Sequence, residues 1–193
     1  MENKAVFLDR DGVITELEAY EKDNLQFILK KEDIRFIEGS IEAIRALNKH
    51  NFKVIIVSNH PQIAKGLITE QQAQEINQII KEHFKNNGAI IDEIIYCPHH
   101  PKSDSEYYSE ECNCRKPKPG MILQAANKSN INLKESWMVG DRISDIKAGR
   151  DAGCKTIGVR TGYACEDNFT DAQPNILVKD ITEAVQYILQ NTN

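Results

Sequence analysis

The chain has 193 residues, of which 40% are hydrophobic and 27% charged, and its formal net charge at pH 7 is −5. This composition is typical of one soluble globular domain, and the acidic balance argues against a broad basic surface for nucleic acid. No stretch reaches the roughly 18 apolar residues of a membrane span, and the N-terminus lacks a signal-peptide core. We therefore expect one domain over residues 1–193, a monomer, in the cytoplasm.

Short apolar runs alternate with segments of helical period along the chain. This alternation predicts an α/β fold with a mainly parallel central sheet and helices on both faces. The runs expected to form strands are Ala5–Asp9, Lys53–Val57, Ile90–Cys97, Trp137–Val139, Lys155–Arg160 and Ile176–Val178. Helices are expected after an N-cap at Ser40, after a capping box at Thr69 and Gln72, from Pro119, over residues 144–153, and from Asp180 to Leu189.

Residues 13–38 show no sustained period, although Tyr20, Phe27 and Phe36 lie there among many charges. A loop of this length inside a compact domain usually has a function. One interpretation is therefore a flap that faces a substrate. The alternative is a surface excursion with a small strand at Ile34–Ile37.

Polar residues follow three of the predicted strands at their carboxyl ends. These are Asp9 and Asp11, the pair Ser58 and Asn59, and Asp141. Each alone is explained by a helix cap or a turn. In open α/β sheets, however, ligands bind at this edge, so the three placements together predict one ligand site.

The residue types of this site suit phosphoryl transfer. Asp9 would attack phosphorus and form an aspartyl-phosphate, while Asp11 would protonate the leaving alcohol and later activate water. Crowding beside Asp9 favours the protonated form of Asp11. Mg²⁺ would be held by Asp9, Asp141 and a backbone carbonyl, and Ser58 and the amide of Asn59 would donate to phosphate oxygens.

The order and spacing of these residues resemble the four motifs of the haloacid dehalogenase superfamily. The motifs are Asp9-x-Asp11-Gly12, Ser58-Asn59, Lys116, and Gly140-Asp141-x-x-x-Asp145. The resemblance implies a Rossmann-like sheet, with Asp9 as nucleophile, Asp11 as acid/base and Lys116 as phosphate stabiliser. It further implies that Asp9, the Asp11 carbonyl and Asp141 hold Mg²⁺, and that Asp145 is a capping or outer residue rather than a direct ligand.

A loop rich in cysteine predicts a second metal. Cys97-x-His99 is followed, after twelve residues, by Cys112-x-Cys114, which offers the three thiolates and one imidazole of a structural zinc site. The alternatives are a disulfide, which the tight spacing disfavours, and free thiols beside an unrelated histidine. His100 in place of His99 as the ligand also stays open.

The loop ends at Arg115 and Lys116, so zinc would anchor the base of both. Arg115 can pair with a second phosphate on the substrate, because a guanidinium matches phosphate geometry. The alternative is a solvated basic turn. We also include Arg10 among the expected substrate-binding residues.

Longer motifs narrow the resemblance. They are residues 7–14, Cys97-Pro98-His99-His100-Pro101, Cys112-x-Cys114-Arg115-Lys116-Pro117-x-Pro119-Gly120-Met121 and Val139-Gly140-Asp141. From Ala5 to about Gly162 the chain resembles the zinc-containing D-glycero-D-manno-heptose-1,7-bisphosphate 7-phosphatases, whose closest relatives are histidinol-phosphate phosphatases. The resemblance implies a capless enzyme whose zinc loop, about 97–119, shapes the pocket for a small phosphorylated substrate. It also implies a place in nucleotide-activated heptose supply for bacterial surface polysaccharide.

Departures from that family lie beside the expected pocket. Thr15 replaces a common Asn, Glu38 replaces a common Pro, and His60-Pro61-Gln62 replaces Gln-Ser-Gly. They leave the catalytic residues in place but bear on the substrate. The alternatives are a phosphatase for histidinol phosphate or another small sugar phosphate, and a non-catalytic zinc-stabilised binding protein.

Overall fold

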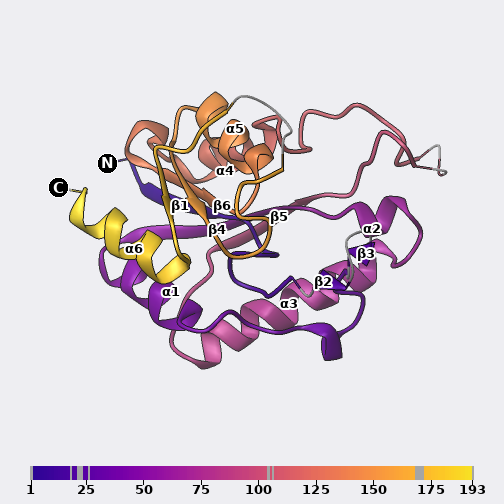
Figure 1. Ribbon diagram of the computed structural model, residues 1–193, viewed down its shortest axis with the longest axis horizontal. Helices are drawn as coiled ribbons and strands as arrows, with labels where there is room; N and C mark the ends of the chain where they lie inside the picture. Colours follow the sequence, from indigo (N-terminus) through magenta and orange to yellow (C-terminus); the bar gives the residue numbers. More distant parts are fainter. Residues whose placement is uncertain are drawn as a thin grey trace.

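A computed structural model describes residues 2–17, 19–20, 24–25, 27–103, 105, 107–167 and 172–192. Its centre is a six-stranded sheet in which every neighbouring pair is parallel (Figure 1). In spatial order the strands are β5 (Glu93–Cys97), β4 (Phe52–Asn59), β1 (Lys4–Leu8), β6 (Trp137–Gly140), β7 (Lys155–Val159) and β8 (Ile176–Val178). The α/β fold with a parallel sheet is therefore confirmed.

Helices cover both faces of the sheet, because successive strand residues point to opposite sides. Val6 and Leu8 belong to one core, while Ala5 and Phe7 belong to the other. The first core is closed by α1 (Ser40–Lys49), α3 (Glu70–Asn86) and α6 (Ile181–Gln190), and the second by α4 (Gly120–Ser129) and α5 (Ile143–Ala152). Figure 1 shows α4 and α5 above the sheet and the other three below it. None of the helices in the described ranges has the length and apolar character of a membrane span.

Helix ends follow the expected chemistry with one exception. The capping box at Thr69 and Gln72 opens α3, and the Asp180 carboxylate accepts two backbone N–H bonds at the start of α6. The expected N-cap at Ser40 was wrong. Gly39, with φ of 80°, precedes the helix and Ser40 is its first residue. The one-turn helix α2 (Pro61–Ala64), directly after β4, was not predicted.

The segment between β1 and α1 folds back on itself, so that its first and last parts lie side by side. Thr15 forms an isolated bridge with Phe36, so the strand considered at Ile34–Ile37 was wrong. The segment also contains an antiparallel pair, β2 (Ala19–Tyr20) and β3 (Asn24–Leu25), and several of its residues, among them Phe27 and Ile28, line the cavity described below. Residues 18, 21–23 and 26 of the expected flap lie outside the described ranges.

Candidate active site and metal centre

The carboxyl ends of β1, β4 and β6 meet at one cavity of about 280 Å³. Of the expected site residues, those that line it are Asp9, Asp11, Ser58, Asn59, Arg115 and Lys116. Asp141 is fully buried beside it. The structure thus brings together the polar residues that follow the three strands, as their placement at one sheet edge predicted.

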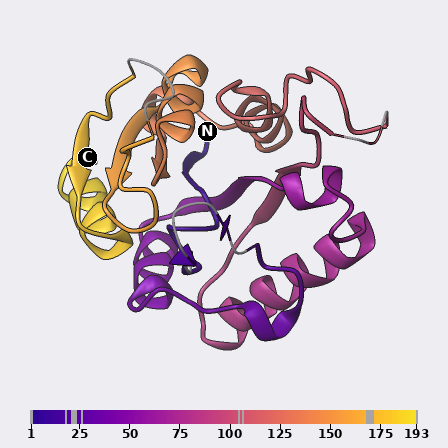
Figure 2. The ribbon, with the colours of Figure 1, turned by 45° about the vertical axis from the view of Figure 1, so that its right-hand side comes forward.

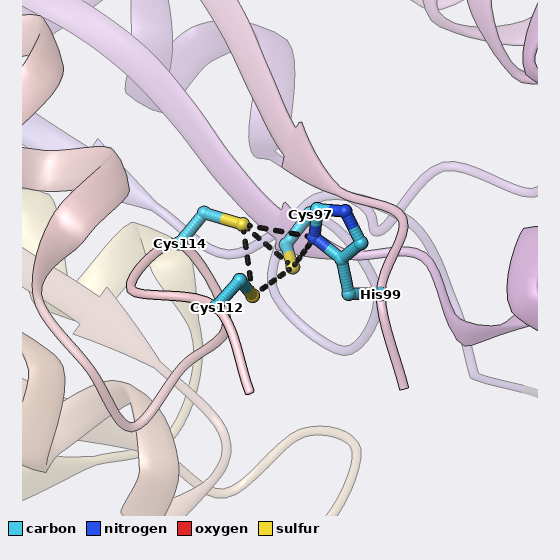
Figure 3. A group of neighbouring side chains, drawn as sticks. All are labelled: Cys97, His99, Cys112 and Cys114. Atoms are coloured by element: carbon cyan, nitrogen blue, oxygen red, sulfur yellow. Dashed lines mark hydrogen bonds between the residues drawn. The ribbon is translucent and has the colours of Figure 1, made fainter. Parts of the chain in front are cut away.

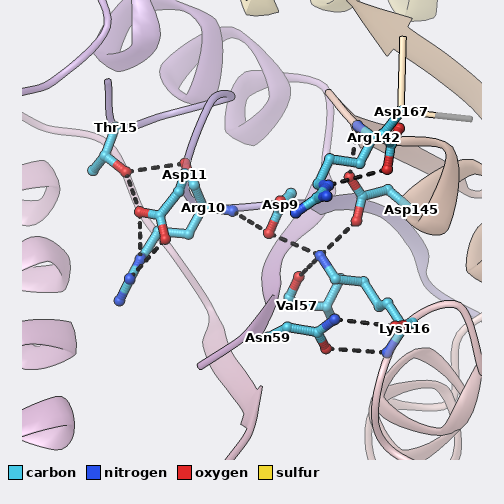
Figure 4. Close-up of polar contacts among 10 residues, drawn as sticks. All are labelled: Asp9, Arg10, Asp11, Thr15, Val57, Asn59, Lys116, Arg142, Asp145 and Asp167. Atoms are coloured by element: carbon cyan, nitrogen blue, oxygen red, sulfur yellow. Dashed lines mark hydrogen bonds and ion pairs between the residues drawn. The ribbon is translucent and has the colours of Figure 1, made fainter. Parts of the chain in front are cut away.

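The buried ammonium group of Lys116 is the centre of this cluster (Figure 4). Its Nζ lies 2.8 Å from Asp9 Oδ1 and 2.7 Å from Asp145 Oδ1, and it donates a hydrogen bond of 2.7 Å to the Val57 carbonyl. The other oxygen of Asp145 accepts the backbone N–H of Arg142 at 3.0 Å, at the start of α5. The expected capping role of Asp145 is therefore confirmed.

Asp141 has an oxygen that lacks a partner. Its Oδ2 accepts the backbone N–H of Tyr163 at 2.8 Å, while its buried Oδ1 has no hydrogen-bond partner among the described residues. The backbones of Gly12 and Gly162 both lie against this carboxylate, with φ of 88° and 63°, and a Cβ at either position would collide with Oδ2. The side chain is thus fixed by its packing rather than by hydrogen bonds to both of its oxygens.

The three carboxylates together fit a divalent cation. One oxygen from each of Asp9, Asp141 and Asp145 lies within 4.8 Å of the others. No described residue donates a hydrogen bond to the Asp11 carbonyl. This carbonyl and the unpartnered Asp141 Oδ1 are hard oxygen donors of the kind that Mg²⁺ prefers.

Burial controls the proton affinity of this cluster. It raises the pKa of Asp9 to about 6 against the opposing effect of Lys116, and it raises the pKa of Asp141 well above its ordinary value, aided by Asp145. Burial would lower the pKa of Lys116, but Asp145 and Asp9 outweigh it and raise that pKa. The lysine therefore stays charged, whereas Asp9 and Asp141 take up protons more readily than free aspartates.

Magnesium affinity should therefore fall in mild acid. A metal ion must displace any proton from its carboxylate ligands, so below pH 6 the apparent Kd for Mg²⁺ should rise about tenfold per pH unit for each proton displaced. Calorimetric titration with Mg²⁺ at pH 7.5 and pH 5 measures this shift, and Ca²⁺ titration at the same pH values tests whether it is general. Equal Mg²⁺ affinity at the two pH values would contradict the assignment of these ligands.

Arg10 and Asp11 differ from expectation. The Arg10 side chain is 1% exposed and does not line the cavity, so its position does not support the expected role in substrate binding. Its guanidinium instead contacts the Asp11 carboxylate, with Nε–Oδ1 and Nη2–Oδ2 distances of 2.9 and 2.8 Å. Burial acts to raise the pKa of Asp11, but Arg10 outweighs it and the pKa is lowered. The effect expected from crowding by Asp9, a raised pKa of Asp11, is thus outweighed by the pairing with Arg10, which favours the carboxylate.

Asn59 positions the backbone that carries Lys116. Its side-chain Oδ1 accepts the Lys116 N–H at 3.0 Å, and its Nδ2 donates to the Lys116 carbonyl at 3.1 Å. The side chain of Ser58, 2% exposed, lies beside it on the cavity wall. The pair at the end of β4 therefore combines a hydroxyl at the cavity with an amide that fixes the loop carrying Lys116.

The cavity is also lined by residues that the sequence did not single out as site residues, among them Phe27, Lys65, Arg142 and Tyr163. Lys65 Nζ lies 4.9 Å from the centre of the Phe27 ring, and the Arg142 guanidinium lies 4.0 Å from that of Tyr163. Arg142 directly follows Asp141, which was a usable signal. The others come from loops without periodicity, where sequence spacing does not determine position.

The expected zinc ligands lie together at the end of β5 (Figure 3). The Sγ of Cys114 lies 3.0 Å from that of Cys97 and 3.1 Å from that of Cys112, and Nδ1 of His99 lies 3.4 Å from Cys114 Sγ. At a Zn–S distance of about 2.3 Å, thiolates around tetrahedral zinc lie about 3.8 Å apart, so ligation would require these sulfur atoms to move apart by several tenths of an ångström. All five cysteines are free, so the disulfide alternative was wrong, and the cluster can hold a metal ion.

His99 rather than His100 belongs to this cluster. The Nε2 of His99 lies 3.1 Å from Glu110 Oε1, a carboxylate partner of the kind that orients metal-bound histidines. His100 lines the cavity, and its Nδ1 accepts the Lys102 N–H at 3.1 Å. The same loop also holds Arg115, whose Nη1 donates to the His99 carbonyl at 2.9 Å. Figure 2 shows the chain leaving β5 and extending outward before it returns to α4.

Comparison with known proteins agrees with this geometry. A family model described as HAD-hydrolase-like matches residues 113–184, which include Lys116, Asp141 and Asp145. The D-glycero-beta-D-manno-heptose-1,7-bisphosphate 7-phosphatase of Vibrio cholerae is 39% identical over 191 residues, which are 98% of each chain. The enzyme of the same name from Yersinia pestis is 41% identical over 161 residues, covering 82% of this chain and 81% of its own.

Solved structures share the fold. The crystal structure of D,D-heptose 1,7-bisphosphate phosphatase from B. bronchiseptica, complexed with magnesium and phosphate, matches with a TM-score of 0.82 and 26% identity. The match covers 98% of this chain and 99% of that one. The corresponding phosphatase from Burkholderia thailandensis, at 21% identity and a TM-score of 0.69, shares the fold over 98% of this chain and 100% of its own. The chain therefore belongs to the D-glycero-beta-D-manno-heptose-1,7-bisphosphate 7-phosphatase family of the haloacid dehalogenase superfamily.

Proposed function

We propose that this protein is a Mg²⁺-dependent phosphatase that removes the 7-phosphate of D-glycero-D-manno-heptose 1,7-bisphosphate through an aspartyl-phosphate. The observation that carries the proposal is the contact of Lys116 Nζ with both Asp9 and Asp145, beside the unpartnered oxygen of Asp141. The names of the relatives support the sugar, and they specify the beta anomer, which we assign to this chain. The product would supply the synthesis of nucleotide-activated heptose.

The first half-reaction uses Asp9 as nucleophile. Its Oδ1 accepts the Arg10 N–H at 2.8 Å and pairs with Lys116, while its Oδ2 has no partner among the described residues and is the oxygen that attacks. As the Oδ2–P bond forms, the bond from phosphorus to the sugar oxygen breaks. Asp11 enters this step in its protonated form, which the pairing with Arg10 disfavours, and transfers that proton to the sugar oxygen. The ammonium of Lys116 balances negative charge on the phosphoryl group.

The second half-reaction returns the enzyme to its starting state. Asp11, now a carboxylate, accepts a proton from water as the water oxygen bonds to phosphorus. The bond from phosphorus to Asp9 breaks, inorganic phosphate leaves, and the Asp9 carboxylate is restored. The pairing of Asp11 with Arg10 suits this step, because it favours the ionised carboxylate.

Two metal ions complete the proposal. Asp9, the Asp11 carbonyl and Asp141 would hold Mg²⁺, which supplies positive charge to the phosphoryl oxygens when it is bound. Cys97, His99, Cys112 and Cys114 would hold Zn²⁺ in a closed site without catalytic chemistry. The zinc site would fix Arg115 through the hydrogen bond to the His99 carbonyl.

The outer part of the cavity suits a second phosphate. Arg115, Lys65 and Arg142 line the cavity and carry positive charge. Of its acidic side chains, Asp9 and Asp145 pair with Lys116 and Asp11 pairs with Arg10, which leaves Glu16. A substrate with one phosphate at Asp9 would extend its other phosphate toward these cations. The distribution of charge thus favours a bisphosphate over a monophosphate.

Replacing Arg115 should therefore separate the two kinds of substrate. Arg115→Ala should lower kcat/KM for the heptose bisphosphate by about 10- to 100-fold, the loss expected for one charge-assisted hydrogen bond, and should affect p-nitrophenyl phosphate much less. Lys118→Ala, which removes an exposed neighbouring charge outside the cavity, is the matched control. Equal losses on the two substrates would reject a contact between Arg115 and the distal phosphate.

Phosphate release from a panel of substrates tests the function itself. The panel holds both anomers of heptose 1,7-bisphosphate, fructose 1,6-bisphosphate and histidinol phosphate, each with Mg²⁺. We expect the beta heptose bisphosphate to give the highest kcat/KM. A preference for histidinol phosphate would retain the mechanism but overturn the assigned substrate, and release from none of them would overturn both.

A further inference from the structure

Arg10 is a buried cation that the proposed phosphatase mechanism leaves unused. It follows the nucleophile directly, yet its side chain is 1% exposed and does not line the cavity. A guanidinium removed from water to this extent requires partners with matched geometry. Its contacts therefore indicate what it does.

The main partner of Arg10 is the acid/base carboxylate. Nε and Nη2 contact the two oxygens of Asp11 at 2.9 and 2.8 Å, in the bidentate arrangement that fixes both position and orientation. The hydroxyl of Thr15 donates to Asp11 Oδ1 at 2.8 Å. Both oxygens of Asp11 are thus held, while its side chain remains 25% exposed and lines the cavity.

A second contact anchors Arg10 to the body of the fold. Its Nη1 donates to Asn77 Oδ1 at 3.2 Å, and Asn77 is a buried residue of α3. Figure 4 shows the guanidinium beside Asp11 and apart from the group formed by Asp9, Lys116 and Asp145. The pair of Arg10 and Asp11 therefore does not compete with Asp9 and Asp145 for the ammonium group of Lys116.

Other basic groups do not replace Arg10 in this role. Lys116 is committed to Asp9, Asp145 and the Val57 carbonyl. His60 is fully buried and stacks on Tyr96, and burial together with Arg10 keeps its pKa well below the ordinary value, so the ring is neutral. Among the described residues, Arg10 is thus the charged group that binds the Asp11 carboxylate.

We infer that Arg10, anchored by Asn77, is a positioning residue that fixes the Asp11 carboxylate at the cavity wall. Arg10 does not touch the substrate, and it acts on catalysis only through Asp11. The inference rests on the proposed role of Asp11 as acid/base. It assigns the residue between the two catalytic aspartates to orientation of the second one.

A double-mutant cycle with two leaving groups tests this inference. A sugar alkoxide needs the proton that Asp11 transfers, whereas p-nitrophenolate leaves without one. Arg10→Met should therefore lower kcat/KM for the heptose bisphosphate by about 10- to 100-fold and change that for p-nitrophenyl phosphate by less than about threefold. In an Asp11→Asn background the same replacement should change kcat/KM by less than about twofold, because the interaction is already lost.

Matched variants keep the test independent of folding. Asn77→Ala loosens the anchor but leaves Arg10 in place, and it should show the same dependence on leaving group with a smaller loss. Arg10→Lys keeps the charge without the bidentate contact and should recover part of the activity. Arg150→Met on the exposed end of α5 is the control for loss of an arginine, and thermal melting with zinc content reports folding.

The outcomes are distinct. Equal losses on the two substrates, additive losses in the Asp11→Asn background, or a raised KM at unchanged kcat would each overturn the inference. If Asp11→Asn alone kept nearly full activity on the heptose bisphosphate, the acid/base assignment in the proposed function would fall, and the inference with it. Losses confined to the alkyl substrate and absent without Asp11 would support the positioning role.

Discussion

Asp9→Asn should abolish phosphatase activity, with a loss of at least about a thousandfold in kcat, because an amide oxygen does not form the aspartyl-phosphate. The amide has nearly the same shape as the carboxylate and still accepts hydrogen bonds from the Arg10 N–H and Lys116 Nζ, the groups that contact Asp9 Oδ1. The fold should therefore persist. Phosphate release from the heptose bisphosphate measures the loss, and circular dichroism with zinc content measures the fold.

The control for this variant is Asp151→Asn. Asp151 lies on α5, where it pairs with Lys147 at 2.6 Å in an i, i+4 contact far from the chemistry of Asp9. It should keep activity close to that of the unmodified protein. Turnover by Asp9→Asn near that level would contradict the assignment of the nucleophile, while loss of structure would show that Asp9 contributes mainly to stability.

Cys112→Ser should remove zinc and destabilise the protein together. The four ligands come from the end of β5 with the residues after it and from a second segment fifteen residues on, and the described residues 98–119 contain no helix or strand, so metal ligation would add a strong link between these two segments. We expect a loss of at least about 3 kcal/mol, which lowers Tm by roughly 6–12 °C in a chain of this size. Elemental analysis and thermal melting measure the two effects.

Cys165→Ser is the matched control, because Cys165 is a free thiol outside the cluster. It should keep one zinc per chain. Unchanged zinc content in Cys112→Ser would refute the ligand set. Since Arg115 is held by the His99 carbonyl, activity on the heptose bisphosphate should fall with the zinc content, and p-nitrophenyl phosphate should be affected less.

The sheet and the meeting of polar residues could be predicted because they depend on local sequence. Apolar runs specify buried parallel strands, and parallel strands present their carboxyl ends at one edge, so Asp9, Ser58 and Asp141 had to lie near one another. Ligand spacing at the two ends of one loop likewise restricted the zinc set. In both cases a short motif fixes the chemistry and the topology fixes the place.

The contacts of the Arg10 and Asp11 side chains could not be predicted in this way. Their orientation depends on Asn77, which lies 67 residues further along the chain and reaches Arg10 only through the packing of α3 on the sheet. Crowding by Asp9 suggested a raised pKa for Asp11, whereas the guanidinium of Arg10, which Asn77 anchors, lowers it. Lys65 and Tyr163 were not predicted as cavity residues for the same reason, since tertiary packing alone brings them to the cavity.

The packing of Gly12 and Gly162 around Asp141 has a consequence for mutational tolerance. Neither glycine carries a functional group, yet any side chain at either position would displace the Asp141 carboxylate. A saturation library scored for activity should therefore tolerate substitution at these two positions as poorly as at the aspartates themselves. Gly66 and Gly153 also have positive φ but meet no atom within 4 Å, so their substitutions should reduce stability and leave turnover by the folded fraction unchanged. In a family of such sequences, the two kinds of glycine would evolve at different rates.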